Sequence, residues 1–215
     1  IKIVCGDTKV VENGNGDKLF INTTGIGVIS RNRPLGMRSI KVGDKIIISG
    51  TIGEHGAAIM NERNNLCESS LLKSDCQSLN GIIESILNSS SEIKVMRDPT
   101  RGGVITTLLE IIDASKKEML IYEDKLPISS EVSEFSDLLG LNPLYMANEG
   151  KVIIIVSNQH AIDVLNLLRN SQEGQEATII GEVIADGKKN LYLETIIGAK
   201  IKCFPMKGEQ LPRIC

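Results

Sequence analysis

The chain ends in a cysteine, and a thiol at the end of a chain could act as a nucleophile or as a carrier. Cys215 is the last of 215 residues and follows a largely polar stretch that contains two prolines. Prenylation is excluded, because it needs a cysteine at the fourth position from the end. Arg213 could partly offset the α-carboxylate, which disfavours the thiolate. We predict a mobile tail over residues 205–215 whose thiol carries a small group, with an ordinary terminal residue as the alternative.

Two further segments place charged residues where a strand is expected to stop. Gly6-Asp7-Thr8-Lys9 offers a carboxylate, a hydroxyl and an ammonium group, which suit a metal-bound nucleotide phosphate. A turn with exposed charges is the alternative. Residues 97–103, Arg-Asp-Pro-Thr-Arg-Gly-Gly, precede an expected helix, whose N-terminus favours anions. Asp98 and Pro99 fit an ordinary capped helix start equally well.

A third segment, Asn148-Glu149-Gly150, precedes an apolar run at 152–156. A glutamate at the edge of a core strand could be a general base, whereas a glutamate that faces water is the alternative. His55 lies at an expected helix start, where a structural role is favoured and a role in a pocket stays open. The other thiols are interpreted as small core or surface groups, namely Cys5, Cys67, Cys76 and Cys203.

The elements that must position these residues alternate between strands and helices. Apolar, β-branched runs predict strands at 1–5, 19–29, 45–49, 93–96, 119–122 and 152–156, with more strands within 177–204. Apolar residues at helical spacing predict helices around 57–63, 79–87, 104–112, 132–139 and 161–168. Ser74 or Asp75 is expected to cap the second of these helices, and Gly140 to end the fourth. This order predicts an α+β fold in which a mixed sheet is covered by helices.

The bulk composition narrows the classes of protein to consider. The net charge is −3 and the pI is near 5.6, and no basic stripe is interleaved with aromatics, which argues against nucleic-acid binding. No apolar run approaches the roughly 18–20 residues that would span a membrane, so a cytoplasmic location is expected. The five cysteines and two histidines show no zinc-ligand spacing, and we predict no metal held by protein ligands alone.

Taken in this order, the motifs resemble those of the HypE family, the carbamoyl dehydratases of hydrogenase maturation. That family lies in the superfamily of aminoimidazole ribonucleotide synthetase and selenophosphate synthetase. The resemblance covers essentially the whole chain, and the terminal tetrapeptide is its most specific element. It rests on Gly-Asp-Thr-Lys (6–9), Asn-Thr-Thr-Gly-Ile-Gly (22–27), Gly-Thr-Ile-Gly-Glu-His-Gly (50–56), the motif at 97–103, Asn-Glu-Gly (148–150) and Pro-Arg-Ile-Cys (212–215).

The resemblance implies a domain organisation and a reaction. Residues 1–32 would be the last strands of a truncated N-terminal ATP-binding domain, 33–204 the C-terminal domain of the aminoimidazole ribonucleotide synthetase-like fold, and 205–215 the tail. The terminal thiol would receive a carbamoyl group, and ATP with Mg²⁺ would drive dehydration of the thiocarboxamide to a thiocyanate. The chain opens on an isoleucine in mid-strand, so this piece is expected to lack much of the ATP site and to be inactive alone.

The resemblance also implies roles and partners. Cys215 would carry the substrate, Glu149 would deprotonate the carboxamide nitrogen, and Lys9 would stabilise charge on the oxygen or the γ-phosphate. Asp7 and Thr8 would lie near the metal-nucleotide, with Asp98 near the phosphates. The implied partners are the carbamoyltransferase HypF, the iron-carrying HypC–HypD complex and, for the full-length protein, a second copy in a homodimer.

Two other functions remain open from the sequence. One is an ATP-dependent phosphotransferase of the same superfamily that makes a free small product, and such an enzyme has no need of a terminal cysteine. The other is a docking module that presents the thiol to partner proteins without catalysing the reaction itself.

Overall fold

The structure is a computed structural model that describes residues 2–16, 19–28, 36–66, 72–89 and 92–206. The chain divides by its contacts into two units, residues 1–33 and 34–215. In the first unit, the described residues form a turn at 13–16 and no strand, so the strands predicted at 1–5 and 19–29 are wrong for this structure. Apolar side chains such as Val4 and Phe20 are exposed there, and a strand needs a neighbour that takes up its backbone hydrogen bonds.

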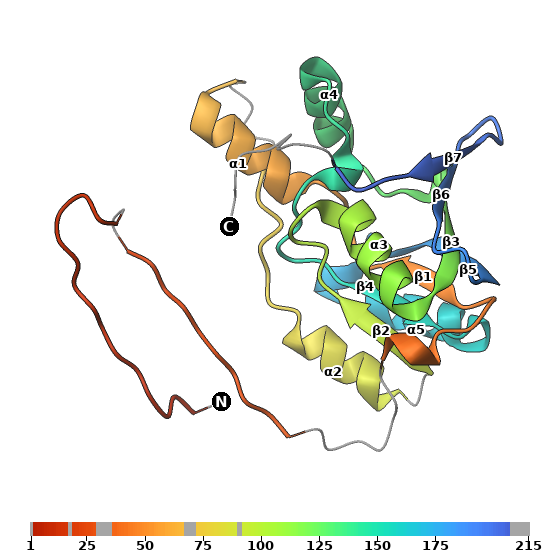
Figure 1. Cartoon of the computed structure of the whole chain (residues 1–215), viewed down its shortest axis with the longest axis horizontal. Coiled ribbons are helices and arrows are strands. Elements are labelled where there is room, and N and C mark those ends of the chain that lie inside the picture. The colour runs from red at the N-terminus through yellow and green to blue at the C-terminus, as the bar shows by residue number, and fades with distance from the viewer. Residues whose placement is uncertain (1, 17–18, 29–35, 67–71, 90–91, 207–215) are drawn as a thin grey trace. The chain divides into compact units, whose positions relative to one another are not determined.

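The second unit is built on a seven-stranded sheet with the strand order β2-β4-β1-β5-β3-β6-β7 (Figure 1). All neighbouring strands are antiparallel except β3 and β6, which are parallel, so the sheet is mixed as predicted. The strands are β1 (Lys45–Ile48), β2 (Ile93–Arg97), β3 (Lys117–Tyr122), β4 (Ile153–Val156), β5 (Thr178–Asp186), β6 (Leu191–Glu194) and β7 (Lys200–Cys203).

Five α-helices and several single 3₁₀ turns surround this sheet within the described residues. The helices are α1 (Glu54–Asn64), α2 (Asn80–Asn88), α3 (Gly103–Ser115), α4 (Ser130–Leu139) and α5 (Ala161–Arg169). The 3₁₀ turns are Met37–Ser39, Glu123–Lys125, Pro143–Tyr145, Asn158–His160 and Gln172–Gly174. In the described ranges, no helix is both long and apolar enough to cross a membrane.

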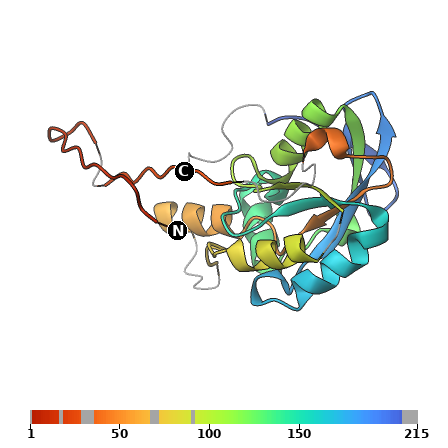
Figure 2. The same cartoon turned by 90° about the horizontal axis from the view of Figure 1, so that it is seen from below.

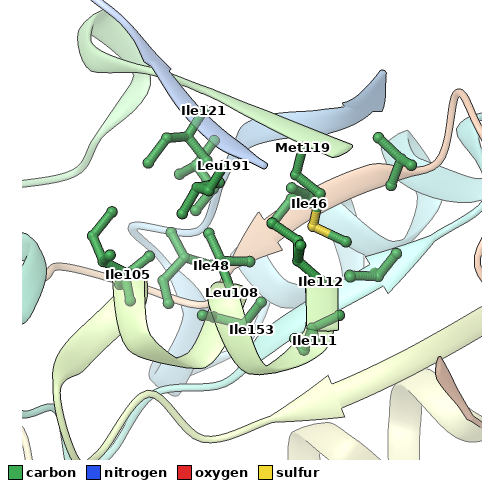
Figure 3. Close-up of a cluster of buried hydrophobic side chains, with 14 of the residues drawn as sticks. Ile46, Ile48, Ile105, Leu108, Ile111, Ile112, Met119, Ile121, Ile153 and Leu191 are labelled. Carbon is green, nitrogen blue, oxygen red and sulfur yellow. The ribbon is translucent and has the colours of Figure 1, made fainter. Parts of the chain in front are cut away.

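The central strands β1 and β4 are buried on both faces, which explains why they are continuously apolar. Ile46 and Ile48 of β1 pack with α3 in one core cluster, whereas Ile47 packs with α2 and α5 in another. Successive side chains of a strand point to opposite faces, so three consecutive isoleucines serve both cores. Figure 2 shows α3 on one side of the sheet and α2 and α5 on the other, and Figure 3 shows the α3 side chains against β1, β3 and β6.

The register of β1 against β4 carries this packing into the loops beyond both strands. Ile48 lies opposite Ile153, and the backbone N–H of Ser49 donates to Val152 O at 3.1 Å. The backbone N–H of Val152 donates in turn to Ser49 Oγ at 3.0 Å. The end of β1 and the start of β4 are therefore fixed next to each other.

The predicted cap of α2 is wrong. The helix begins at Asn80, and its N-cap residue Leu79 offers no side-chain hydrogen bond. Ser74 and Asp75 instead contact residues far along the chain, as the next section describes. The predicted helix end at Gly140 is confirmed, because Gly140 has the left-handed conformation that ends α4.

Candidate active site

The side-chain amide of Asn148 holds three loops together. Its side chain is completely buried, and Oδ1 accepts the backbone N–H of Gly53 at 2.8 Å. Nδ2 donates to Pro99 O and to Met146 O, both at 3.0 Å. The backbone N–H of Asn148 adds a 3.2 Å bond to Pro99 O. The loop before α1, the 97–103 loop and the 146–150 loop therefore meet at one residue. The sequence analysis singled out each of these segments but did not predict their contact.

Asp75 fixes the backbone of Glu149. Its Oδ1 accepts the N–H of Glu149 at 3.0 Å, although the two residues are 74 positions apart. The neighbouring Gly150 leaves no room for a side chain, since a Cβ there would lie 1.9 Å from Asp75 O. Gln77 Nε2 also donates to Gly150 O at 2.9 Å. The segment before α2 therefore sets the position of the predicted base.

Buried charges of both signs surround this contact. The side chain of Asp75 is fully buried, and its Oδ2 lies 3.9 Å from Lys151 Nζ. Lys151 is also buried and lies 3.4 Å from Glu54 Oε2. A buried ammonium group that contacts two carboxylates is stabilised by them, because each group by itself would lose much of its hydration energy. Lys151 therefore neutralises part of the negative charge beside Glu149.

His55 completes the cluster at the second position of α1. Its Nε2 lies 3.9 Å from Glu149 Oε1, and its Nδ1 lies 2.8 Å from Ser74 Oγ. Within the described ranges, the buried oxygens Glu149 Oε1 and Asp75 Oδ2 have no hydrogen-bond partner. A carboxylate oxygen without a donor retains the capacity to accept a proton. The backbone of Glu149 is thus held while one of its oxygens stays unpaired among the described residues, and its role as a general base stays a prediction.

The 97–103 loop lies beside this cluster, because Pro99 O accepts hydrogen bonds from Asn148. Asp98 does not cap α3. The exposed Asp98 accepts the hydroxyl of Thr100 at 2.8 Å, and the N-cap residue of α3 is Gly102. Gly103 has a positive φ of 64°, and a Cβ there would lie 2.5 Å from Leu144 O. This glycine therefore permits close packing of the chain on itself, and the role of Asp98 near phosphates stays a prediction.

The remaining predicted site residues lie outside the described part of the second unit. Asp7, Thr8 and Lys9 belong to the first unit and are exposed there, with the N–H of Thr8 donating to Asp7 Oδ1 at 2.8 Å. An exposed carboxylate, hydroxyl and ammonium in one short stretch fit a Mg²⁺-bound phosphate. Cys215 and most of the predicted tail lie outside the described residues. Among the described residues, no group of three or more His, Cys, Asp or Glu side chains could hold a metal ion.

The sequence does not predict a place in the site for four residues of the cluster, namely Glu54, Asp75, Asn148 and Lys151. Glu54 and Asn148 lie inside motifs described above, whereas Lys151 lies just after one. Ser74 or Asp75 was expected to cap α2. The signal that could have found Lys151 and Asp75 is a pair of charged residues in otherwise buried surroundings, and burial becomes visible only when the sheet is assembled.

A cavity of about 480 Å³ lies where β7 ends. It is lined mainly by apolar side chains and by Tyr145, whose hydroxyl donates to Phe204 O at 2.7 Å. Cys203 also lines this cavity, and burial raises the pKa of its thiol. Burial therefore lowers the thiolate fraction of Cys203 below that of an ordinary cysteine.

We predict that Cys203 reacts with iodoacetamide more slowly than the exposed Cys76 at pH 8, because less of it is thiolate. Its rate should continue to rise with pH above the ordinary cysteine range, since the thiolate forms only there. Peptide mapping after a short alkylation at several pH values measures both rates. Equal rates for the two thiols across this range would contradict the prediction.

The family model described as AIR synthase related protein, C-terminal domain, matches residues 41–194. The chain belongs to this family. It is 42% identical over 215 residues to the carbamoyl dehydratase HypE of Azotobacter vinelandii. The aligned region spans all of this chain and 63% of the length of that protein. The match falls on the C-terminal portion of the longer relatives, and the resemblance to the HypE family is confirmed.

Three solved structures are similar to this chain over most of its length. Escherichia coli HypE, described as a hydrogenase maturation protein, has a TM-score of 0.83 at 38% identity over 88% of this chain and 58% of that chain. A chain of a HypE–HypF complex has a TM-score of 0.75 at 39% identity over 79% and 55%. A HypE in complex with ATP has a TM-score of 0.78 at 37% identity over 84% and 55%. The predicted fold class is thereby confirmed.

Proposed function

We propose that the protein that contains this chain is an ATP-dependent carbamoyl dehydratase, which converts a thiocarboxamide on Cys215 to a thiocyanate for hydrogenase maturation. The observation that carries the proposal is the Glu149 carboxylate, whose backbone Asp75 holds and whose buried Oε1 has no hydrogen-bond partner among the described residues. Dehydration of a carboxamide needs such a base. The names of the relatives support the same reaction.

The chemistry assigns a role to each predicted residue. ATP, when bound, supplies the phosphoryl group that makes the carboxamide oxygen a good leaving group. Glu149 takes a proton from the carboxamide nitrogen, and Lys9 stabilises negative charge on the oxygen or the γ-phosphate. Asp7 and Thr8 are proposed to hold the nucleotide with its Mg²⁺, with Asp98 near the phosphates. The exposed donors at residues 7–9 and the structure of a relative in complex with ATP support this assignment.

The proposed partners follow from the group that is carried. HypF is proposed to load the carbamoyl group onto Cys215, and the structure of a HypE–HypF complex supports this pairing. The HypC–HypD complex is proposed to receive the cyano group on its iron, and the full-length protein is proposed to be a homodimer.

The test is mass spectrometry of the full-length protein after incubation with HypF, carbamoyl phosphate and ATP. We expect a gain on Cys215 that matches one carbamoyl group, followed over time by a loss that matches one water. Cys215→Ala should show neither change. Cys203→Ala is the matched control, because it removes another thiol of the C-terminal region and should leave both changes intact. An adduct that persists in Cys215→Ala would refute the carrier role.

A further inference from the structure

The imidazole of His55 lies beside the proposed base and faces its unpaired oxygen. We propose that His55 acts through Glu149. After Glu149 has removed the first proton from the carboxamide nitrogen, His55 accepts that proton, so that Glu149 can remove the second. The proposal rests on the proposed function, since it concerns the dehydration of the thiocarboxamide. It adds a path for the proton to the site. It also gives a function to the contact between His55 of α1 and Glu149.

The stoichiometry of the reaction requires such an acceptor. The carboxamide nitrogen begins with two N–H bonds, and the nitrile product has none. The first N–H bond breaks as the oxygen takes the phosphoryl group of ATP and a C=N bond forms. The second breaks as the C–O bond breaks, the C≡N bond forms, and the oxygen leaves within phosphate. A carboxylate holds one proton at a time, so Glu149 must pass the first proton on before it can accept the second.

The geometry places His55 beside Glu149 for this transfer. Its Nε2 lies 3.9 Å from Glu149 Oε1, a small side-chain movement beyond the hydrogen-bond range of about 2.7–3.2 Å. Both side chains are largely buried, with 12% and 25% of their surfaces exposed. Water is thus mostly kept away from the pair, and the proton passes between the two side chains.

Ser74 contacts the other ring nitrogen of His55 and can accept its proton. Its Oγ lies 2.8 Å from His55 Nδ1 and also accepts the backbone N–H of Cys76 at 3.2 Å. With a proton on Nδ1 donated to Ser74 Oγ, the lone pair of Nε2 faces Glu149. The serine is held by its own loop, so it orients the imidazole before the reaction begins.

The charges around the pair are mostly negative. Glu54, Asp75 and Glu149 bring three carboxylates to this cluster, and Lys151 contacts the first two at 3.4 and 3.9 Å. A proton that passes from Glu149 to His55 therefore stays among groups of opposite charge.

The decisive experiment is a single-turnover measurement on the full-length protein, carbamoylated by HypF and then mixed rapidly with ATP. His55→Gln should still accept carbamoyl but dehydrate at least about 100-fold more slowly, the lower end of what acid–base groups contribute.

Two further measurements separate a proton acceptor from a structural residue. Added imidazole should restore the rate of His55→Ala in proportion to the neutral imidazole present, which no structural role predicts. NMR of the wild type labelled with ¹⁵N-histidine should show His55 protonated on Nδ1. His160→Gln is the matched control, because His160 has the same 2.8 Å contact from Nδ1 to a serine hydroxyl, that of Ser157, and should keep the wild-type rate.

The outcomes distinguish this proposal from the function on which it rests. If the wild type dehydrates and His55→Gln keeps the wild-type rate, the proton path is wrong and the function stands. A slow variant without rescue by imidazole, or an Nε2-protonated tautomer, also overturns the path. If the wild type accepts carbamoyl but never loses water with ATP, the proposed function itself is wrong.

Discussion

Glu149→Gln is expected to accept a carbamoyl group and then stop before dehydration. The amide has nearly the same shape as the carboxylate, and its backbone N–H would still donate to Asp75 Oδ1. It cannot take a proton from nitrogen, so the rate of water loss should fall by about 10²–10⁴-fold. Time-resolved mass spectrometry after the addition of ATP should show the carbamoyl adduct persisting while the wild type converts it.

An exposed glutamate provides the control for this substitution. Glu84 lies on the surface of α2, so Glu84→Gln makes the same chemical change away from the cluster and should dehydrate normally. Normal dehydration in Glu149→Gln would remove Glu149 from the role of base. The cluster would then be read as a structural network that positions the loops around the site.

Asn148→Asp is expected to have the largest effect on stability. The substitution keeps the shape of the side chain and the bond from Gly53 N–H, but an oxygen replaces the nitrogen that donates to Pro99 O and Met146 O. A buried carboxylate would then face two carbonyl oxygens. We expect the free energy of unfolding to fall by about 3 kcal/mol or more, the cost of an uncompensated buried charge. Urea denaturation followed by circular dichroism measures this loss.

The pH dependence of this loss has a definite sign. Burial without a positive partner raises the pKa of the introduced carboxyl in the folded state above its unfolded value. The folded variant then binds more protons, so its deficit relative to the wild type should grow as pH rises and shrink as pH falls. Asn142→Asp is the control, because the exposed Asn142 uses only its oxygen, which accepts the N–H of Leu144. That substitution should change stability by less than about 0.5 kcal/mol.

The layers of the fold were predictable because their signals are local. The isoleucine runs at 46–48 and 153–155 identify strands buried on both faces, and the apolar periodicity of 104–112 identifies α3. The strands predicted at 1–5 and 19–29 were wrong because alternating apolar residues form a strand only beside a partner. The described residues of the first unit provide none.

The candidate site was predictable only in part, for a related physical reason. Glu149 and His55 stand out because each lies in a short motif at the end of an expected element. Asp75 was assigned to the cap of α2, since a short polar residue before a helix usually acts there. Its contact with the backbone of Glu149 spans 74 positions, and no local pattern reports such a distance. Lys151 carries no local signal either, because its burial becomes visible only in the assembled fold.

The pairing of β1 with β4 also ties the proposed active site to the centre of the sheet. Ile48 lies opposite Ile153, and Ser49 and Val152 extend that ladder towards His55 on one side and Glu149 on the other. A slip of one residue would move one partner by about 3.4 Å along the strand and turn its side chains to the opposite face. An insertion within β1, remote from any reacting atom, would therefore behave as an active-site mutation. In a library of random insertions and deletions, variants that change the length of β1 should therefore rarely remain active.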